Sequence, residues 1–350
     1  MAYNVNKLDR DDKLRVEAMA LFKTYGYERY RTAKFESYEV YRRNKNYIGD
    51  ESIVTFTSAS GKLMALRPDV TLGIVNNITP FANKKYCYDE NVFRRDEKGE
   101  YKELRQVGVE YIGANGSYPE YETVALAVKA LGLIKEDYVL TIGHMDVVDA
   151  LLCELNLDAD KREKVLECIR AKANHELKKL LGEEGESLIA LVSTEGNWED
   201  ALAMAGTIAG KKAEKSIAEL NQLLITLKKA GLDKKVKLDF SLISDYRYYN
   251  GIVFTGFVKG VPMAVLTGGR YDNMMKRLGK GDSAIGFALD FDAIARLPKC
   301  EDEYDVIVVY GETSSDVVAE KVEEETQKGN RTLALKTDDG SIKAKQRIVL

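Results

Sequence analysis

The feature that most constrains the fold of this chain is a pair of long β-rich runs separated by a short polar turn. The first run, KKYCYDENVFRR, covers residues 84–95, and the second, ELRQVGVEYIG, covers residues 103–113. Strand-forming residues on both sides of the charged turn DEKGEY predict an antiparallel pair of strands. Any fold of this chain must therefore contain a sheet built around that pair.

Further strand-forming runs lie in the second half of the chain, so close together that antiparallel pairing is favoured over strand–helix–strand crossovers. They are VKLDFSLI (236–243), NGIVFTGFV (250–258), VPMAVLTGG (261–269) and SAIGFALDF (283–291). Residues from about 157 to 235 are instead rich in Ala, Leu, Lys and Glu and show helical periodicity. We therefore expect an α+β fold in which a helical insertion separates two halves of one sheet.

Other helices and turns are readable from local patterns. Apolar residues recur every three or four positions from Asp9 to Tyr25, and Gly26 follows them, which predicts a first helix. The stretch 56–75 alternates and then becomes apolar, which predicts a hairpin leading into a helix. The amphipathic run after the strand pair is expected to end at Gly132, and His144 is expected at the end of a strand, close to a helix start.

The domain organisation follows from these patterns. Residues 1–298 are expected to form one core that includes the insertion. After Pro298 an acidic linker leads to residues 303–350, where a strand, an amphipathic helix and a second strand predict a βαβ-like unit. About 48 residues bury too little apolar surface for secure independent stability. We therefore expect this unit to dock on the core or on a partner, or to be loosely ordered.

Composition excludes several function classes. The chain has 52 basic and 56 acidic residues, a net charge of -4, which argues against a tRNA or other nucleic-acid partner, although a local basic patch remains compatible. It contains no run of eighteen apolar residues, and its charged N-terminus lacks a signal peptide, so a cytoplasmic protein without a membrane span is expected. The four cysteines show no C-x-x-C spacing and there are two histidines, so we expect no metal and no cofactor.

The strand pair carries the most informative polar residues. Arg94 and Arg95 end the first strand, while Gln106, Gly108 and Glu110 share one face of the second. Paired arginines at a sheet surface suit a carboxylate or a phosphate, which a guanidinium holds with two hydrogen bonds. A solvated hairpin with charged ends has the same spacing, so both interpretations stay open.

Two other motifs allow a structural and a functional interpretation. In LRPDVT, Pro68 is a candidate first residue of a helix with Asp69 in its first turn, but Asp69 is also a candidate acceptor for a ligand's ammonium group. In the Tyr-rich stretch, Tyr248 and Tyr249 are expected on opposite faces of a strand, so only one of them need line a pocket. Arg270 in GGRYD is a possible anion-binding residue or a surface arginine after a turn.

Taken together, these motifs resemble the histidyl branch of the class II aminoacyl-tRNA synthetases over roughly residues 5 to 297. LRPDVT is similar to that branch's Leu-Arg-Pro-Glu-x-Thr, and NVFRR with RQVGVE to its motif 2. DYRYYNGIVF resembles its histidine-binding segment, GGRYD its Gly-rich strand, and SAIGFALDFDAI its motif 3. The order of the five motifs is preserved.

The resemblance implies a six-stranded antiparallel sheet with flanking helices, a homodimer, and a pocket for histidine on the face of the sheet. It implies roles for particular residues. Asp69 and Thr71 would face the α-ammonium group, Gln106 and Glu110 the amino acid, Tyr248 and Tyr249 the imidazole, and Arg94 would lie where a synthetase binds the adenylate phosphate.

The departures from the synthetase pattern fall where ATP is activated. Where the histidine-binding segment of synthetases opens with Arg-Gly, this chain has Ser244 and Asp245, and Arg247 replaces an aspartate. Motif 3 of synthetases ends in Gly-Leu-Glu-Arg, whereas here Ala293 replaces the arginine and Asp292 adds a carboxylate. Loss of two cations and gain of an anion costs several kcal/mol in a phosphate site.

The regions that meet the tRNA also depart from the synthetase pattern. The motif 2 loop is shortened, with Glu97 and Glu100 at positions where arginines are usual, and Ala33 replaces the proline of motif 1. The resemblance implies that the C-terminal anticodon domain is reduced to the unit 303–350. An amino-acid pocket is thus retained, while ATP activation and tRNA reading are not.

This combination resembles the regulatory subunits of ATP phosphoribosyltransferase, which have no catalytic site of their own. The resemblance implies a hetero-oligomer with a short-form catalytic subunit, in which the regulatory chains form a homodimer and histidine is the effector. It implies a role in the first step of histidine biosynthesis, with histidine feedback inhibition. The alternatives are a working histidyl-tRNA synthetase and a stand-alone histidine-binding paralogue.

Overall fold

The structure is a computed structural model of the chain and describes residues 8–44, 52–95, 99–194, 197–244, 248–298 and 304–350. It divides into two compact units. One comprises Glu17–Arg296, and the other comprises Met1–Val16 together with Leu297–Leu350. The division into domains 1–298 and 303–350 that we expect from the sequence stays a prediction.

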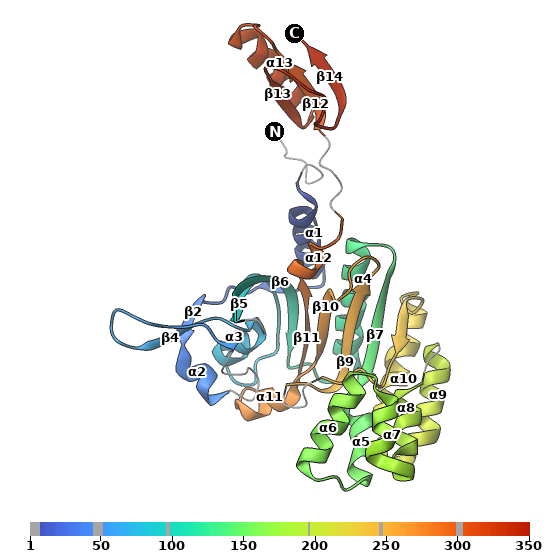
Figure 1. Cartoon of the computed structure of the whole chain (residues 1–350). Coiled ribbons are helices and arrows are strands. Elements are labelled where there is room, and N and C mark those ends of the chain that lie inside the picture. The colour runs from blue at the N-terminus through green and yellow to red at the C-terminus, as the bar shows by residue number, and fades with distance from the viewer. Residues whose placement is uncertain (1–7, 45–51, 96–98, 195–196, 245–247, 299–303) are drawn as a thin grey trace. The chain divides into compact units, whose positions relative to one another are not determined.

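A large twisted sheet organises the first unit (Figure 1). Its centre is an antiparallel run of six strands, which confirms the expected class II synthetase-like sheet. In spatial order they are β5 (Lys84–Arg95), β6 (Tyr101–Ile112), β11 (Ala284–Asp290), β10 (Leu266–Arg270), β9 (Asn250–Val258) and β7 (Tyr138–His144). Within the described residues, short parallel strands extend the sheet at both ends: β1 (Glu28–Arg29) pairs with β5, and β8 (Val236–Leu238) pairs with β7.

The pairing of β8 differs from the sequence-based expectation. The run 236–243 was expected to pair antiparallel, but only Val236–Leu238 forms a strand, and it is parallel to β7. The physical reason is the helical insertion, because it lies between β7 and β8 in the chain. A parallel pair requires a long crossover connection, and the insertion provides one.

Helices cover one face of this sheet. The long helix α4 (Ser117–Ile134) packs across β6, β11, β9 and β7. Helix α1 (Arg10–Thr24) contributes Phe22, whose ring meets that of Phe287 edge to face at 5.7 Å. The expected helix end at Gly132 is wrong, since α4 continues to Ile134. A glycine within a helix costs only about 1 kcal/mol, which the packing of α4 on the sheet outweighs.

The region expected to be helical forms a bundle beyond the end of β7, as Figure 1 shows in green and yellow. Helix α5 (Met145–Glu154) leads into it, and His144 at the end of β7 is the N-cap residue of α5, as expected. The bundle consists of α6 (Ala159–Arg170), α7 (Asn174–Leu181), α8 (Glu186–Val192), α9 (Trp198–Ala209) and α10 (Glu214–Lys229), with two short 3-10 turns, Gly182–Gly185 and Gly210–Ala213. None of the helices in the described ranges combines the length and apolar character of a membrane span.

Three short strands form a second, small antiparallel sheet. Its strand β4 leads directly into the segment that carries Asp69. It has the order β2 (Phe35–Ser37), β4 (Leu63–Leu66), β3 (Thr55–Thr57), and the short helix α2 (Tyr38–Arg43) follows β2. Strand β4 runs into α3 (Val70–Asn77), which confirms the expected hairpin and helix over 56–75. After β10 and β11 come two short helices, α11 (Asp272–Arg277) and α12 (Phe291–Ile294).

Residues 304–350 of the second unit form a three-stranded parallel sheet with one helix. The elements are β12 (Tyr304–Val309), α13 (Ser315–Gln327), β13 (Thr332–Leu335) and β14 (Ala344–Val349). The strand order is β13-β12-β14, so the first three elements form a parallel βαβ arrangement. Strand β14 adds a third parallel strand, which the sequence patterns did not predict.

Candidate functional site

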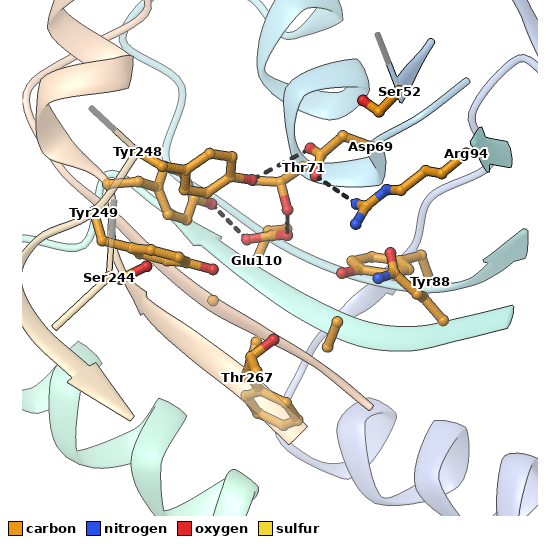
Figure 2. Close-up of a pocket in the computed structure, with 15 residues that line it drawn as sticks. Ser52, Asp69, Thr71, Tyr88, Arg94, Glu110, Ser244, Tyr248, Tyr249 and Thr267 are labelled. Atoms are coloured by element: carbon orange, nitrogen blue, oxygen red, sulfur yellow. Dashed lines mark hydrogen bonds and ion pairs between the residues drawn. The ribbon is translucent and has the colours of Figure 1, made fainter. Parts of the chain in front are cut away.

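A cavity of about 420 Å³ opens on the large sheet. It brings together seven of the eight residues singled out from the sequence, namely Asp69, Thr71, Arg94, Gln106, Glu110, Tyr248 and Tyr249 (Figure 2). The remaining lining residues are Ser52, Tyr88, Ser244, Thr267, Tyr271, Gly286, Phe287 and Ala288.

The buried Arg67 fixes the segment that carries Asp69. Its guanidinium is fully buried and donates to the main-chain carbonyls of Thr32, Ala33 and Asn91. It also forms an ion pair with Glu90 at 3.1 Å. A buried arginine is tolerated only when its donors are satisfied in this way. The LRPDVT motif therefore anchors the start of α3 through its arginine, a role that the sequence patterns did not reveal.

Asp69 ends that segment as the N-cap residue of α3. Its Oδ1 atom accepts from the main-chain N–H of Leu72 at 2.7 Å and from the hydroxyl of Tyr248 at 3.2 Å. The expectation that Pro68 begins the helix is wrong, because the helix starts at Val70 and Asp69 has extended backbone geometry. An aspartate side chain caps a helix well. Its second oxygen, Oδ2, lies 3.6 Å from Arg94 Nη2, and both residues line the cavity.

Glu110 lies at the floor of the cavity with only 1% of its surface exposed. The hydroxyl groups of Thr71 and Tyr271 both donate to its carboxyl oxygens. Burial raises the pKa of Glu110 to about 8, and these hydrogen bonds only partly oppose that effect. At neutral pH the carboxyl group is therefore mostly protonated, so it both donates and accepts hydrogen bonds without carrying charge.

Two glycines leave the space that these side chains occupy. Gly286 on β11 pairs with Glu110 on β6, and a Cβ atom there would lie 1.9 Å from Glu110 Oε2. A Cβ atom on Gly108 would lie 2.6 Å from the hydroxyl oxygen of Tyr88. Any side chain at either position would therefore displace a residue that lines the cavity.

Tyrosines form much of the remaining wall. Tyr248 and Tyr249 both line the cavity, with ring centroids 4.7 Å apart, although strand alternation requires only one of them there. Both residues precede β9, which starts at Asn250, and strand alternation therefore does not apply to them. Burial raises the pKa of each phenol, which keeps both hydroxyl groups protonated at neutral pH.

Tyr88 and Tyr271 are cavity residues that the sequence patterns missed. Tyr88 projects from β5 opposite Gly108, and Tyr271 follows β10 and donates to Glu110. Both are 1% exposed. Tyr271 belongs to the GGRYD motif, in which the arginine was the candidate. The glycine pair of that motif, two residues before Tyr271, could have indicated this tyrosine in the sequence. Tyr88 can be recognised as a cavity residue only from the register of β5 and β6.

Arg270 does not line this cavity. It donates to Glu120 at 2.6 Å and to Asp272 at 2.9 Å, and 14% of its side chain is exposed. Two carboxylates therefore already pair with its charge, and its anion-binding role stays a prediction. The buried His144 lies elsewhere as well, with its Nε2 atom 3.5 Å from a carboxylate oxygen of Glu219.

Arg94 is the cation of the cavity. Its Nε atom donates to the carbonyl oxygen of Pro68 at 2.7 Å, and its Nη2 atom lies 3.6 Å from Asp69 Oδ2. Arg95, the next residue on β5, is exposed and donates to the carbonyl of Gly99 instead. Among the described residues that line the cavity, Arg94 alone carries a permanent positive charge.

The end of the sheet that holds ATP phosphates in synthetases is occupied by carboxylates. Asp292 accepts from the main-chain N–H of Arg105 at 2.9 Å, and Asp290 caps α12 by accepting from the N–H groups of Asp292 and Ala293. Ala293 is buried, and Ser244 lines the cavity without a positive charge. Three other departures from the synthetase pattern, Glu97, Asp245 and Arg247, lie outside the described residues.

The described residues contain no group of three His, Cys, Asp or Glu side chains arranged to hold a metal ion. The fold defines a class II aminoacyl-tRNA synthetase-like protein with a cavity on the face of its sheet. In agreement, the histidyl-tRNA synthetase family profile matches residues 4–294.

Proteins of similar sequence show to which branch of this protein class the chain belongs. A protein of Caldanaerobacter subterraneus, named ATP phosphoribosyltransferase regulatory subunit, is 31% identical over 304 residues, covering 82% of this chain and 77% of its own. A protein of the same name from Desulfitobacterium hafniense is 30% identical over 329 residues, covering 90% and 85%. The chain belongs to the ATP phosphoribosyltransferase regulatory subunits, a non-catalytic branch of the histidyl-tRNA synthetase family.

Solved structures agree on the fold. A Bacillus halodurans protein described as an ATP phosphoribosyltransferase regulatory subunit/histidyl-tRNA synthetase superposes with a TM-score of 0.76 at 22% identity, covering 97% of this chain and 93% of its own. A chain from the ATP phosphoribosyl transferase complex of Thermotoga maritima gives a TM-score of 0.62 at 19% identity, covering 83% and 98%.

Proposed function

We propose that this chain binds free histidine in the cavity and regulates a short-form ATP phosphoribosyltransferase catalytic subunit. In this proposal the cytoplasmic catalytic subunit needs the chain for activity in the first step of histidine biosynthesis. Histidine bound to the chain then inhibits that activity. The names of the relatives support the partnership, and the cavity supports the effector.

The observation that carries the proposal is the arrangement of charge in the cavity. Asp69 offers a carboxylate to an ammonium group, and Arg94 offers a guanidinium to a carboxylate. The protonated Glu110 offers a donor and an acceptor without charge, which suits a neutral imidazole with one nitrogen of each kind. Gln106, Thr71 and the tyrosine wall complete a pocket of amino-acid size.

The same site is poorly suited to ATP activation. A triphosphate needs cations, but Ser244 and Ala293 stand at the two positions where synthetases have arginines, and Asp292 adds a negative charge nearby. Binding without chemistry is useful when occupancy changes the behaviour of a partner. This argument favours a sensor over an enzyme.

The proposed assembly contains a homodimer of this chain. The small sheet exposes Phe35 and Phe56, with 60% and 37% of their surfaces accessible, and their rings meet edge to face at 5.6 Å. Leu63 on the same sheet is 48% exposed. Neighbouring exposed apolar side chains of this kind are typical of protein–protein contact surfaces.

The decisive experiment combines the purified chain with a short-form ATP phosphoribosyltransferase from the same organism. We expect phosphoribosyl transfer to ATP only when both chains are present, and a single complex in size-exclusion chromatography. Addition of histidine should then lower the rate. Full activity of the catalytic chain alone, unchanged by this protein, would contradict the proposal.

A working histidyl-tRNA synthetase is the alternative that makes the opposite prediction for the pure chain. Without the two phosphate-site arginines, we expect histidine-dependent ATP–pyrophosphate exchange at least about 1000-fold below that of a synthetase, since one such group contributes about 100- to 1000-fold. A synthetase assayed in parallel is the control. Measurable charging of histidine tRNA by this chain would establish the alternative.

A further inference from the structure

We infer that the open edge of strand β8 docks an extended segment of a partner protein in which acidic and apolar residues alternate. Strand β8 ends the large sheet, so that one of its sides has no neighbouring strand among the described residues. A partner segment would extend the sheet by one strand, a common mode of peptide recognition. The surface shares no residue with the cavity that Asp69 and Glu110 line, and the inference does not depend on histidine binding.

The main chain of β8 offers hydrogen-bonding groups on that side. The carbonyl of Lys235 and the N–H of Asp239 both bond to β7. Alternate residues of a strand bond to the same neighbour, so the main-chain groups of Val236 and Leu238 point away from β7. The N–H of Val236 donates to the carbonyl of Asp233. Within the described residues, the carbonyl of Val236 and both main-chain groups of Leu238 have no hydrogen-bond partner, so they are available to an added strand.

The edge of β8 borders a large cavity. Val236, Lys237 and Leu238 all line a space of about 1150 Å³. Its other walls come from β7, from the turn between α6 and α7, from the end of α8 and from the start of α9, where Trp198 lies. The cavity therefore gives an extended segment room beside the edge of the sheet.

The side chains of β8 specify the pattern of that segment. Successive side chains of a strand lie on opposite faces of the sheet. Val236 and Leu238 are 5% and 4% exposed, whereas Lys237 between them is exposed. A segment paired with β8 would place every second residue beside the apolar pair and the others beside Lys237. Opposite charges and apolar neighbours across two strands stabilise a sheet, so an alternation of acidic and apolar residues fits.

The charges around the cavity also favour an acidic partner. Its described lining contains four lysines and three acids, namely Lys172, Lys234, Lys235, Lys237, Glu199, Asp233 and Asp239. Two of these acids already have lysine partners, because Asp239 pairs with Lys172 at 2.7 Å and Glu199 pairs with Lys228 at 2.9 Å. Among the described lining residues, Asp233 is then the one acid left to balance three lysines.

A second copy of this chain fits the edge poorly. Antiparallel pairing of two β8 strands about Lys237 would set these two lysines opposite each other, and like charges in that position destabilise a sheet. Lysines on short edge strands commonly prevent such self-association. The lysines of β8 therefore select against a copy of the same strand and in favour of an acidic segment.

The first test is titration of the full-length chain with a short peptide that alternates glutamate and valine. Trp198 is the one tryptophan of the chain and lines the cavity, so its fluorescence reports whether this site is occupied. We expect saturable binding that changes the emission, and binding about 10-fold or more weaker for the peptide with lysine in place of glutamate. No binding, or binding seen by calorimetry with unchanged emission, would overturn the inference.

Methylated peptides test whether the segment pairs as a strand. Two versions of the acidic peptide carry N-methyl groups, one on every glutamate and the other on every valine, so that each loses the main-chain donors on one side only. We expect one version to bind about 10-fold or more weakly and the other to bind nearly as the parent does. Equal affinities of the two versions would mean that no strand pairs with β8, and the inference would be wrong.

Variants then assign the preference for acidic segments to the edge lysines. The double substitution Lys234→Glu with Lys237→Glu should weaken the acidic peptide about 10-fold or more and strengthen the lysine peptide. Lys164→Glu with Lys178→Glu is the matched control, since both residues are exposed on the helical bundle and do not line the cavity. Thermal unfolding of each variant reports whether it is folded. Unchanged peptide affinity in the folded edge variant would contradict the inference.

A short single-stranded RNA separates a protein segment from a nucleic acid. We expect the RNA to leave the bound peptide in place. Displacement of the peptide by RNA of equal or higher affinity would mean that the lysines bind any polyanion, and the inference would fall. The proposed function is tested separately, by histidine binding and by phosphoribosyl transfer, and it stands or fails independently of these peptides.

Discussion

Replacing Glu110 with glutamine is expected to stabilise the protein progressively as the pH rises from about 4.5 to about 8, relative to the wild type. The pKa of Glu110 is raised from its ordinary 4.5 to about 8 because the carboxyl group is buried. That difference corresponds to at most roughly 5 kcal/mol of unfolding free energy. Glutamine resembles the protonated carboxyl group and has no charge to bury.

The direction in which the unfolding free energy of the wild type changes with pH follows from the protons that Glu110 binds in the folded and unfolded states. Below pH 4.5 the folded and unfolded states both hold the proton, so Glu110 does not make the unfolding free energy depend on pH. Between pH 4.5 and 8 the folded state holds a proton that the unfolded state has released, so the stability of the wild type falls as the pH rises. Above about pH 8 both states are ionised and the loss is complete.

Urea unfolding of the wild type and of Glu110→Gln at a series of pH values measures this effect. The two curves of unfolding free energy against pH should diverge across the window and run parallel outside it. Curves that are parallel throughout would mean that Glu110 ionises normally in the folded protein. Histidine binding supplies a second comparison: Glu110→Gln should bind within a few-fold of wild type at pH 7, whereas Glu110→Ala should lose about 10- to 100-fold.

In the complex with the catalytic subunit, Asp69→Asn should raise the histidine concentration for half-inhibition about 100-fold while leaving the uninhibited rate unchanged. The substitution removes the carboxylate proposed to hold the ammonium group. It keeps the cap of α3, because asparagine caps a helix as well as aspartate does. A buried charge pair that loses one partner costs several kcal/mol, which permits an effect of this size.

A matched control exists elsewhere in the chain. Asp158 caps α6 by accepting from the N–H of Lys161, and it does not line the cavity, so Asp158→Asn makes the same chemical change away from the site. Its inhibition curve should match the wild type. If Asp69→Asn also leaves the inhibition unchanged, histidine acts at another site, and the proposed route of feedback is wrong.

Linkage gives an independent check of the same proposal. If histidine on this chain weakens substrate binding by the catalytic subunit, the substrates must weaken histidine binding by the same factor, typically about 5- to 150-fold. Titration of histidine into the complex with and without substrates measures that factor. Equal affinities would mean that this chain supports assembly without carrying the inhibitory signal.

Local patterns were sufficient for much of the sheet and for most of the site. The strand pair β5–β6, the hairpin leading into α3, and the helical insertion follow from hydrophobic periodicity. All seven residues to which the family resemblance gives a role line one cavity. These residues lie far apart in the chain. The order of the motifs therefore predicted that they share a site, whereas the spacing of single residues could not predict it.

The features that local patterns did not reveal share a cause, which is that local rules do not contain the boundaries of elements or their partners. Tyr248 and Tyr249 face the same cavity because β9 starts one residue later, at Asn250. Arg270 is neutralised by Glu120, which lies 150 residues away in the chain. Tyr88 enters the site because the register sets it opposite Gly108.

The sequence by itself determined the class of fold, most of the residues that meet in the cavity, and the absence of the two phosphate-site arginines, because each of these follows from residue types in a fixed order. Only the tertiary structure decided the electrostatic state of the site. The raised pKa of Glu110 requires its burial, and the pairing of Arg94 with Asp69 requires β5 and α3 to meet. Desolvation and distance control both, and neither is set by the chemistry of one residue alone.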